Sequence, residues 1–236
     1  MTLAALVQHS LVLFIAGAIL MALGTARQPV AVRRARVRKL IFFFVIVHGV
    51  IGLAAVGRAG FVALAMAVVG IAAWEGRRAW RRMVSPRPRW LPLAAVVLAA
   101  GYALVSVRLE PRTVAWLFLC TAAFDGFSQV VGQWLGRHPL SPRISPAKTV
   151  EGMLGGLVGA ALVAVWIRDL TPLEPASAGI IGAAIGLASL MGDLAGSWAK
   201  RRADIKDFSA LLPGQGGVID RFNSFVTAMA LVGPWL

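Results

Sequence analysis

The 236-residue sequence has little charge, only 10 acidic residues and a single cysteine, Cys120. One cysteine excludes an intrachain disulfide framework and a cysteine-based zinc site. The chain also lacks a Gly-x-x-x-x-Gly-Lys-Ser/Thr loop, a His-Glu-x-x-His pair and a nucleophile elbow, so a Walker-type NTPase is excluded. Charged residues make up 14% of the chain and hydrophobic residues 58%, whereas about 25% of a soluble domain is charged. This composition indicates an integral membrane protein.

The hydrophobic residues gather into eight stretches, most of them near the ~20 residues that a helix needs to cross the ~30 Å hydrocarbon core of a bilayer. We therefore predict an all-α fold, a polytopic transmembrane helix bundle with about eight spans. The expected spans are residues 4–24, 40–57, 59–75, 91–108, 113–135, 152–167, 178–199 and 217–235. No basic residue precedes Arg27, so the first stretch lacks the charged start of a signal peptide and is expected to be a retained span.

Lysine and arginine fall mainly in alternate loops between the expected spans. Of the 24 Lys and Arg residues, 20 lie on one side, and the other side holds only Arg58, Arg108, Arg112 and Arg168. By the positive-inside rule the richer side is cytoplasmic, which places both termini outside. The expected location is the inner (cytoplasmic) membrane of a bacterium. The basic clusters are short and carry no stacking aromatics, which favours the lipid bilayer as partner and no nucleic acid.

An Arg- and Pro-rich segment, residues 76–90, divides the chain into two expected regions. Residues 1–90 form an N-terminal transmembrane anchor region, and residues 91–236 form a C-terminal region that carries the motifs. Few polar residues interrupt the anchor spans, and they are Gln8, His9, Ser10, His48 and Glu75.

The fifth, seventh and eighth expected spans each carry one acid, Asp125, Asp193 and Asp220. A carboxylate inside a membrane is costly unless it is paired, metal-bound or hydrated. Ion pairs that only hold helices together are one explanation. A functional site is the other, because all three acids lie toward one face of the membrane.

The seventh expected span carries polar residues with helical spacing. Asp193, Ser197 and Lys200 follow at i, i+4 and i+7, so one helix face carries an acid, a hydroxyl and a cation, with Arg201 beside them. In the fifth span, Asp125 shares a face with Gln129 and Gly132. Such faces suit a polar site between helices.

The eighth expected span follows a glycine-rich loop, Pro213-Gly214-Gln215-Gly216-Gly217. A glycine loop that opens a helix presents backbone N–H groups and the positive end of the helix dipole, which suit phosphate. Asp220 and Arg221 then place a ligand for a hard metal and a phosphate-binding guanidinium in the first turn, and Asn223 follows.

The loop between the fifth and sixth expected spans is polar, basic and punctuated by proline over residues 141–152. Ser145, Lys148, Thr149 and Glu151 are candidates to bind phosphate or to orient a nucleotide. A solvated connector is the alternative.

These motifs together resemble the phosphatidate cytidylyltransferases, the CDP-diacylglycerol synthases, over residues 120–225. The resemblance rests on Ser197-Trp198-Ala199-Lys200-Arg201, on Lys206-Asp207-Phe208, on Leu212-Pro213-Gly214-Gln215-Gly216-Gly217-Val218-Ile219-Asp220-Arg221-Phe222, and on Ser145-Pro146-Ala147-Lys148-Thr149-Val150-Glu151-Gly152. The chain departs from the family at Gln215, where the family usually has His, and at Asn223, where it usually has Asp. Asn keeps an oxygen ligand but loses a charge, and Gln cannot carry the proton of His.

The resemblance implies cytidylyl transfer from CTP to phosphatidic acid, with an active site at the cytoplasmic face. It implies Mg²⁺, with room for a second cation, as the cofactor. The implied catalytic residues are Asp193, Lys200, Asp220 and Arg221, and the implied metal ligands are Asp193, Asp220, Asn223 and Asp125. The implied substrate-binding residues are Ser145, Lys148, Thr149, Glu151, Ser197, Arg201, Lys206, Gly216 and Gly217.

Other functions stay open at this point. A divergent member of the family would act on another lipid phosphate, and a CTP-dependent lipid kinase would transfer the γ-phosphate. An ion-coupled transporter would place its acids near the middle of the membrane, between broken helices. A non-catalytic relative would only bind nucleotide or lipid. The glycine-rich sixth and seventh spans suit packing within one bundle or across a homodimer.

Overall fold

The computed structural model describes residues 3–25, 28–83, 87–212 and 216–236, and most of them are helical. A helix is found at each of the eight expected places: α1 (Leu3–Thr25), α2 (Val30–Val56), α3 (Arg58–Arg82), α4 (Trp90–Arg108), α5 (Pro111–Leu135), α6 (Val150–Trp166), α7 (Pro175–Arg202) and α8 (Ile219–Val232). Within the described residues, α3, α4, α5 and α7 are long and apolar enough to cross a membrane, while α6 is a shorter apolar helix. The helical membrane protein is confirmed, and the number of spans stays a prediction.

The loop expected between the fifth and sixth spans contains a β-hairpin, which the all-α prediction missed. Strands β1 (Pro139–Ser141) and β2 (Ser145–Thr149) pair antiparallel, with Pro139 opposite Thr149 and Ser141 opposite Ser145. The strands are short and interrupted by proline, so they show no alternation of apolar and polar residues from which they could be predicted. The hairpin gives Lys148 a fixed backbone, where a solvated connector would leave it free. Two short 3₁₀ turns, η1 (Arg168–Leu170) and η2 (Gly233–Trp235), complete the described structure.

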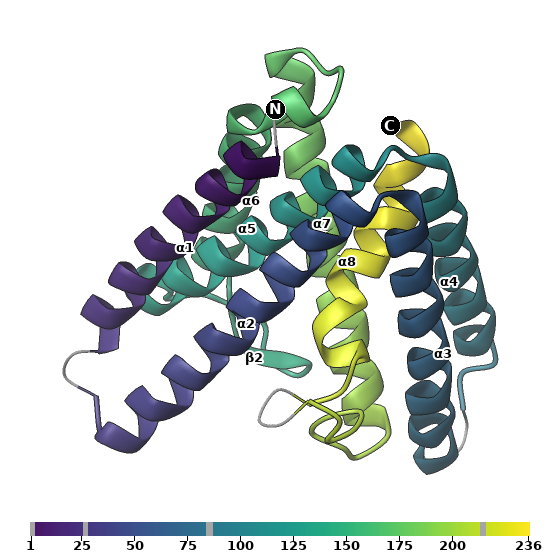
Figure 1. Cartoon of the computed structure of the whole chain (residues 1–236). Coiled ribbons are helices and arrows are strands. Elements are labelled where there is room, and N and C mark those ends of the chain that lie inside the picture. Colours follow the sequence, from purple (N-terminus) through teal and green to yellow (C-terminus); the bar gives the residue numbers. More distant parts are fainter. Residues whose placement is uncertain (1–2, 26–27, 84–86, 213–215) are drawn as a thin grey trace.

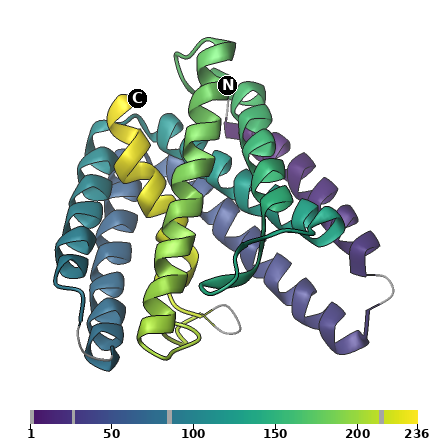
Figure 2. The same ribbon diagram turned by 180° about the vertical axis from the view of Figure 1, so that it is seen from behind.

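Helix α5 packs against α1, α2, α6, α7 and α8, and α8 lies between α7 and the α3–α4 pair. In Figure 1 the two chain ends lie at the top, whereas β2 and the chain that joins α7 to α8 lie at the bottom. Figure 2 shows the same arrangement from behind, with the hairpin close to the lower end of α7. The motif segments therefore share one end of the bundle, as the alternation of basic loops predicts. That this end faces the cytoplasm stays a prediction.

The first half of α5 forms the centre of the core. Trp116 is fully buried, and its Nε1–H donates to the carbonyl oxygen of Ala164 at 3.1 Å, which ties α5 to α6. On the other side, Phe225 of α8 meets the rings of Phe118 and Tyr102 with centroid separations of 5.0 and 5.6 Å. Aromatic contacts of this kind hold α4, α5 and α8 together in the bundle.

Glycines let α6 and α7 approach their neighbours closely. A Cβ added at Gly156 of α6 would collide with Ser128 Oγ and would lie 2.8 Å from the Phe124 ring on α5. A Cβ added at Gly182 of α7 would collide with Ala164 Cβ and would lie 2.9 Å from the Ala160 carbonyl oxygen on α6. Small residues at helix contacts are typical of membrane bundles. Gly156 and Gly182 thus serve helix contacts within one chain. A homodimer stays a prediction.

We predict that Gly182→Ala lowers the free energy of unfolding by about 1–3 kcal/mol, because the added methyl overpacks the α6–α7 contact. The matched control is Gly70→Ala in α3, where an added Cβ meets nothing within 4 Å. This control should leave the protein unchanged or stabilise it by up to ~1 kcal/mol, since alanine favours a helix over glycine. Thermal unfolding in detergent measures both variants, and equal midpoints would contradict the proposed close packing.

Candidate active site

Two lysine–aspartate ion pairs mark the end of the bundle where the motif segments meet. In the first, Lys148 Nζ of β2 lies 2.6 Å from Asp193 Oδ2 of α7. Ser224 of α8 donates its hydroxyl to the other oxygen, Asp193 Oδ1, at 2.8 Å. The side chains of Lys148 and Asp193 are 27% and 26% exposed, so this pair is open to a solute. The pair joins the hairpin to α7 and, through Ser224, to α8.

The second pair is more deeply buried. Lys200 Nζ of α7 lies 2.6 Å from Asp220 Oδ1 of α8, and the Asp220 side chain is only 1% exposed. Asp220 Oδ2 accepts hydrogen bonds from the backbone N–H of Phe208 at 2.9 Å and of Gly217 at 2.8 Å. Lys200 also lies 5.7 Å from the centre of the Phe208 ring, a cation–π distance. Three donors therefore hold the Asp220 carboxylate. Two of them belong to residues 203–218, which join α7 to α8 and are called the motif loop below.

The glycine pair before α8 lies against two carboxylates. Gly216 has φ +87°, a conformation that glycine adopts readily. A Cβ added at Gly216 would lie 2.7 Å from Asp220 Oδ2, and one at Gly217 would lie 2.7 Å from the carboxyl carbon of Glu75. The N–H of Gly217 is donated to Asp220, so phosphate binding by this glycine pair stays a prediction. Pro213, Gly214 and Gln215 lie outside the described residues.

Asn223 lies where α7 and α8 come into close contact. Its Nδ2 donates to the carbonyl oxygen of Gly192 at 3.2 Å. A Cβ added at Gly196, one turn further along α7, would lie 2.7 Å from the same nitrogen. An aspartate would have no N–H to donate to the Gly192 carbonyl. The departure at Asn223 therefore has a structural correlate, a hydrogen bond between helices that only the amide makes.

Asp125 of α5 joins the first ion pair from a third helix. It is half-buried and lies within electrostatic reach of Asp193, Lys148 and Arg221. Two acids and two cations thus share this part of the site. In the chain as described, no three His, Cys, Asp or Glu side chains gather into a metal-binding group. Asp125 and Asp193 supply only oxygen donors, however, and Mg²⁺ at nucleotide sites often uses one or two carboxylates together with substrate phosphates, so this pair fits the expected cation.

Thr149 and Glu151 fix the join between the hairpin and α6. Thr149 is the N-cap of α6, and its Oγ1 accepts from the N–H of Gly152 at 3.1 Å. Glu151 Oε2 accepts from the backbone N–H of Arg137 at 3.1 Å and of His138 at 3.3 Å, and Oε1 pairs with the His138 ring. Both residues thereby orient β2, which carries Lys148. Direct contact of either residue with a substrate stays a prediction.

The remaining predicted residues lie around the two ion pairs. Arg201, Lys206 and Arg221 are exposed, and Ser145 and Ser197 are half-buried. The Arg201 guanidinium approaches the carbonyl oxygen of Ile144 in the hairpin turn at 3.5 Å. Exposed guanidinium and ammonium groups at the edge of a site are suited to attract polyanions. The structure thus brings basic residues of α7, α8 and the intervening loop to the end of the bundle that also holds the hairpin.

Sequence reasoning missed one residue of this region, Glu75. It belongs to α3, within the expected anchor region, yet it is fully buried and accepts hydrogen bonds from Val218 and Ile219 at the start of α8. The signal was present, because an acid in an apolar helix is costly unless it has partners. The division at residue 90 stays a prediction, but α3 contributes to the geometry of the motif loop.

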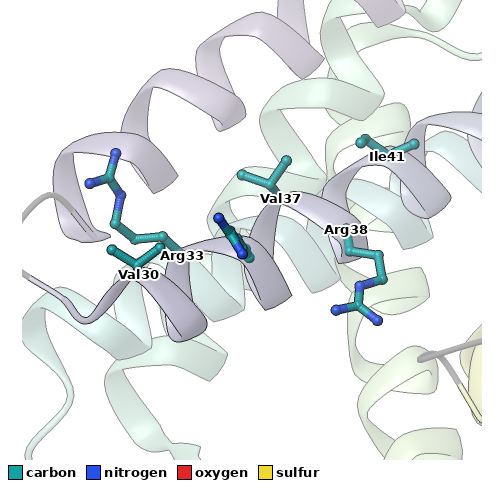
Figure 3. Close-up of a pocket in the computed structure, with 6 residues that line it drawn as sticks. Val30, Arg33, Val37, Arg38 and Ile41 are labelled. Carbon is teal, nitrogen blue, oxygen red and sulfur yellow. The ribbon is translucent and has the colours of Figure 1, made fainter.

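A hollow lies along α2, away from the predicted site. Figure 3 shows its side chains on one stretch of the helix, with arginines between aliphatic residues. The hollow is lined by Val30, Arg33, Arg34, Val37, Arg38 and Ile41. None of the predicted catalytic, metal or substrate residues is among them, so this hollow plays no part in the site described above.

Comparison with known proteins relates the motif region to one family. The model of the cytidylyltransferase family matches residues 93–233. A phosphatidate cytidylyltransferase of Synechocystis is 44% identical over 118 residues, which are 49% of this chain and 40% of that protein. A phosphatidate cytidylyltransferase of Brucella abortus is 32% identical over 182 residues, which are 73% of this chain and 63% of that protein.

An uncharacterized protein of Escherichia coli, YnbB, is 36% identical over 114 residues, 48% of this chain and 38% of that protein. The chain thus spans between 38% and 63% of the length of these relatives. The family match covers more than half of the chain and includes both lysine–aspartate pairs. The chain belongs to the cytidylyltransferase family.

Proposed function

We propose that this protein transfers the cytidylyl group of CTP to phosphatidic acid, giving CDP-diacylglycerol and pyrophosphate. The observation that carries the proposal is the meeting of two lysine–aspartate pairs from separate motifs at one end of the bundle, Lys148 with Asp193 and Lys200 with Asp220. Membership of the cytidylyltransferase family and the names of the Synechocystis and Brucella relatives support this reaction.

The proposed reaction is a substitution at phosphorus. A phosphate oxygen of the lipid forms a bond to the α-phosphorus of CTP, and the bond from that phosphorus to the bridging α–β oxygen breaks. The electron pair of the broken bond leaves with pyrophosphate. The nucleophile is already an anion, so the reaction needs little help from a general base. Its main barriers are the approach of two polyanions and the charge that develops on the phosphoryl and leaving oxygens.

Lysine and arginine side chains meet this requirement. Each lysine ammonium has three N–H donors, so Lys148 and Lys200 retain donors for phosphate oxygens after binding their aspartates. Lys148 is the more exposed of the two and is assigned to the triphosphate. Lys200, with Arg221 after Asp220, is assigned to the reacting phosphoryl group. Arg201 and Lys206, which are exposed, are assigned to the lipid phosphate and to attraction of CTP.

The aspartates and the hairpin residues position these cations. Asp193 orients Lys148, and Asp220 orients Lys200 while holding the motif loop. Thr149 and Glu151 fix the join between the hairpin and α6, and Ser145 pairs with Ser141 within the hairpin. Ser197 lies on the α7 face that carries Asp193 and Lys200. Gly216 and Gly217 let the loop backbone pack closely against the carboxylates of Asp220 and Glu75. These assignments put the triphosphate between the hairpin and the start of α8.

Mg²⁺ is proposed as the cofactor, and Asp193 with Asp125 are the residues best suited to hold it. The Asp193 side chain is 26% exposed, and the half-buried Asp125 lies within electrostatic reach of it. The amide oxygen of Asn223 on α8 accepts from the N–H of Ser224, whose hydroxyl donates to Asp193. Asp220 is a weaker candidate, because it accepts three hydrogen bonds and its side chain is only 1% exposed. When bound, the cation supplies neutralisation of phosphate charge.

We place the site at the cytoplasmic face of the bacterial inner membrane. The basic loops predict this side, CTP is a cytosolic nucleotide, and the phosphate of phosphatidic acid lies at the membrane interface. The two substrates would then meet where the ends of α7 and α8 and the hairpin lie together.

We predict that the purified protein, in detergent with dioleoyl phosphatidic acid, incorporates label into lipid from [α-³²P]CTP and none from [γ-³²P]CTP. Lys148→Met should lower kcat/KM by about 10²–10³-fold, the usual effect of removing one group that stabilises developing phosphoryl charge. The measurement is the initial rate of label transfer at several CTP concentrations.

The matched control is Arg112→Gln, which also removes one positive charge but lies exposed at the start of α5, whereas the hairpin follows the far end of that helix. It should keep the wild-type rate. Lipid labelled from the γ-position would show a kinase instead. Absence of label from either position with phosphatidic acid would reject this substrate, and other lipid phosphates would then be assayed.

We predict that chelation of Mg²⁺ abolishes the transfer and that Asp193→Asn raises the Mg²⁺ concentration for half-maximal rate by about 10-fold or more, because one charge leaves the ligand set. Asn223→Asp should shift that concentration the other way, since it adds a charge. The same variant should lower the thermal midpoint, because it loses the hydrogen bond to Gly192. Identical Mg²⁺ dependence in all three proteins would reject both residues as part of the metal site.

A further inference from the structure

Glu75 makes a buried connection between the expected anchor region and the motif loop. It lies on α3 and has no exposed surface. Its Oε1 accepts from the N–H of Val218 at 3.0 Å and from the hydroxyl of Ser209 at 2.5 Å, and its Oε2 accepts from the N–H of Ile219 at 2.8 Å. All three donors belong to the segment that joins α7 to α8 or to the first residue of α8.

These hydrogen bonds make Glu75 the cap of α8, supplied by another helix. The N-cap residue of α8 is Val218, and α8 has no side-chain capping hydrogen bond of its own. The first N–H groups of a helix lack partners within it, and a negative charge is favourable at this end of the helix dipole. The Glu75 carboxylate therefore satisfies donors that would otherwise be buried without a partner.

Two carboxylates divide the N–H groups of the motif loop between them. Glu75 takes Val218 and Ile219, while Asp220 takes Gly217 and Phe208. Asp220 follows directly after Ile219, in the first turn of α8. The direction of that turn sets where Asp220 and the side chain after it point, and Asp220 in turn orients Lys200. A change at Glu75 is therefore transmitted to the second ion pair within one helical turn.

The Glu75 carboxylate packs so closely against the loop that residue 217 has to be glycine. A Cβ added at Gly217 would collide with Glu75 Oε1 and would lie 2.7 Å from Oε2. The close packing of this carboxylate against the loop backbone leaves little room for the loop to shift. The hydroxyl of Ser209 adds a contact before the glycines, so Glu75 holds the loop on both sides of residues 213–215.

We propose that Glu75 is a positioning residue for the reaction, acting through the first turn of α8 on Asp220, Lys200 and Arg221. The inference rests on the proposed cytidylyl transfer. Glu75 touches no substrate in this account. It fixes the backbone that presents the second ion pair, so a residue outside the matched family region, which begins at residue 93, sets the geometry of a motif within it.

The test compares Glu75→Gln with Gly182→Ala and the wild type. Glutamine keeps the size of the side chain but replaces one acceptor oxygen by an NH₂ group, which would face a backbone N–H. We expect kcat to fall about 10–100-fold at temperatures well below the unfolding midpoint, since small misplacements of catalytic groups cost this much. Glu75→Asp, which keeps the charge on a shorter side chain, should recover part of the rate.

Gly182→Ala provides the control for stability, because it is expected to lower the midpoint through the α6–α7 contact while keeping the wild-type kcat. Should Glu75→Gln not fold, Ser209→Ala removes a single donor to the same carboxylate and should give a smaller loss of kcat in a folded protein.

Hydrogen exchange in residues 216–221 gives a readout of loop position that does not depend on activity, and it should be faster in Glu75→Gln and unchanged in Gly182→Ala. A wild type without transfer activity would refute the proposed function. An active wild type, with Glu75→Gln and Ser209→Ala both at the wild-type kcat and lowered only in midpoint, would overturn the positioning role.

Discussion

The Asp220 carboxylate holds together the segments on which the site depends. It binds the Lys200 ammonium on α7 and the N–H groups of Phe208 and Gly217 in the motif loop, and its own backbone belongs to α8. A carboxylate with a side chain only 1% exposed needs such partners, because a buried charge without them is strongly destabilising. The buried carboxylate of Glu75 has the same need, and it is met by the N–H groups of Val218 and Ile219. Two acids therefore fix the start of α8.

The two ion pairs differ in a way that suits a division of labour. Lys148 and Asp193 are each about a quarter exposed, at 27% and 26%, and come from a hairpin and a helix. Asp220 is almost fully enclosed. The first pair is therefore accessible to a solute, while Asp220 of the second pair holds the backbone of the loop before α8. Ion pairing therefore does not exclude a functional site built on the same acids, although the sequence alone presents the two as alternatives.

Much of the fold follows from the lengths of the apolar stretches and from the distribution of charge. The apolar stretches locate all eight helices, and the alternation of basic loops agrees with the placement of both termini at one end and the motif segments at the other. The hairpin over 139–149 escapes this reasoning, because its strands are too short and too polar to show a period. The same reasoning also cannot identify the partner of each acid. Lys148 and Asp193 are 45 positions apart, and only the packing of α5, α6 and α7 brings them together.

Glu75 is a second case in which the sequence does not reveal a distant partner. Its apolar surroundings and its place in the expected anchor region gave no reason to connect it with the glycine loop, 143 positions away, yet the hydrogen bond to Val218 joins them. The glycine pair was expected to offer N–H groups to phosphate. The described structure gives the N–H groups of Gly217, Val218 and Ile219 to carboxylates, which explains the glycines as a requirement of close packing.

The central claim is that the two lysine–aspartate pairs form the nucleotide end of the site. The most direct measurement is an experimental structure of the full chain with Mg²⁺ and α,β-methylene-CTP, whose α–β bridge cannot be cleaved. This account predicts the triphosphate between the hairpin and the start of α8, with phosphate oxygens within hydrogen-bonding distance of Lys148 and Lys200. A triphosphate bound elsewhere, such as along the arginine-lined hollow of α2, with both ion pairs undisturbed, would contradict it.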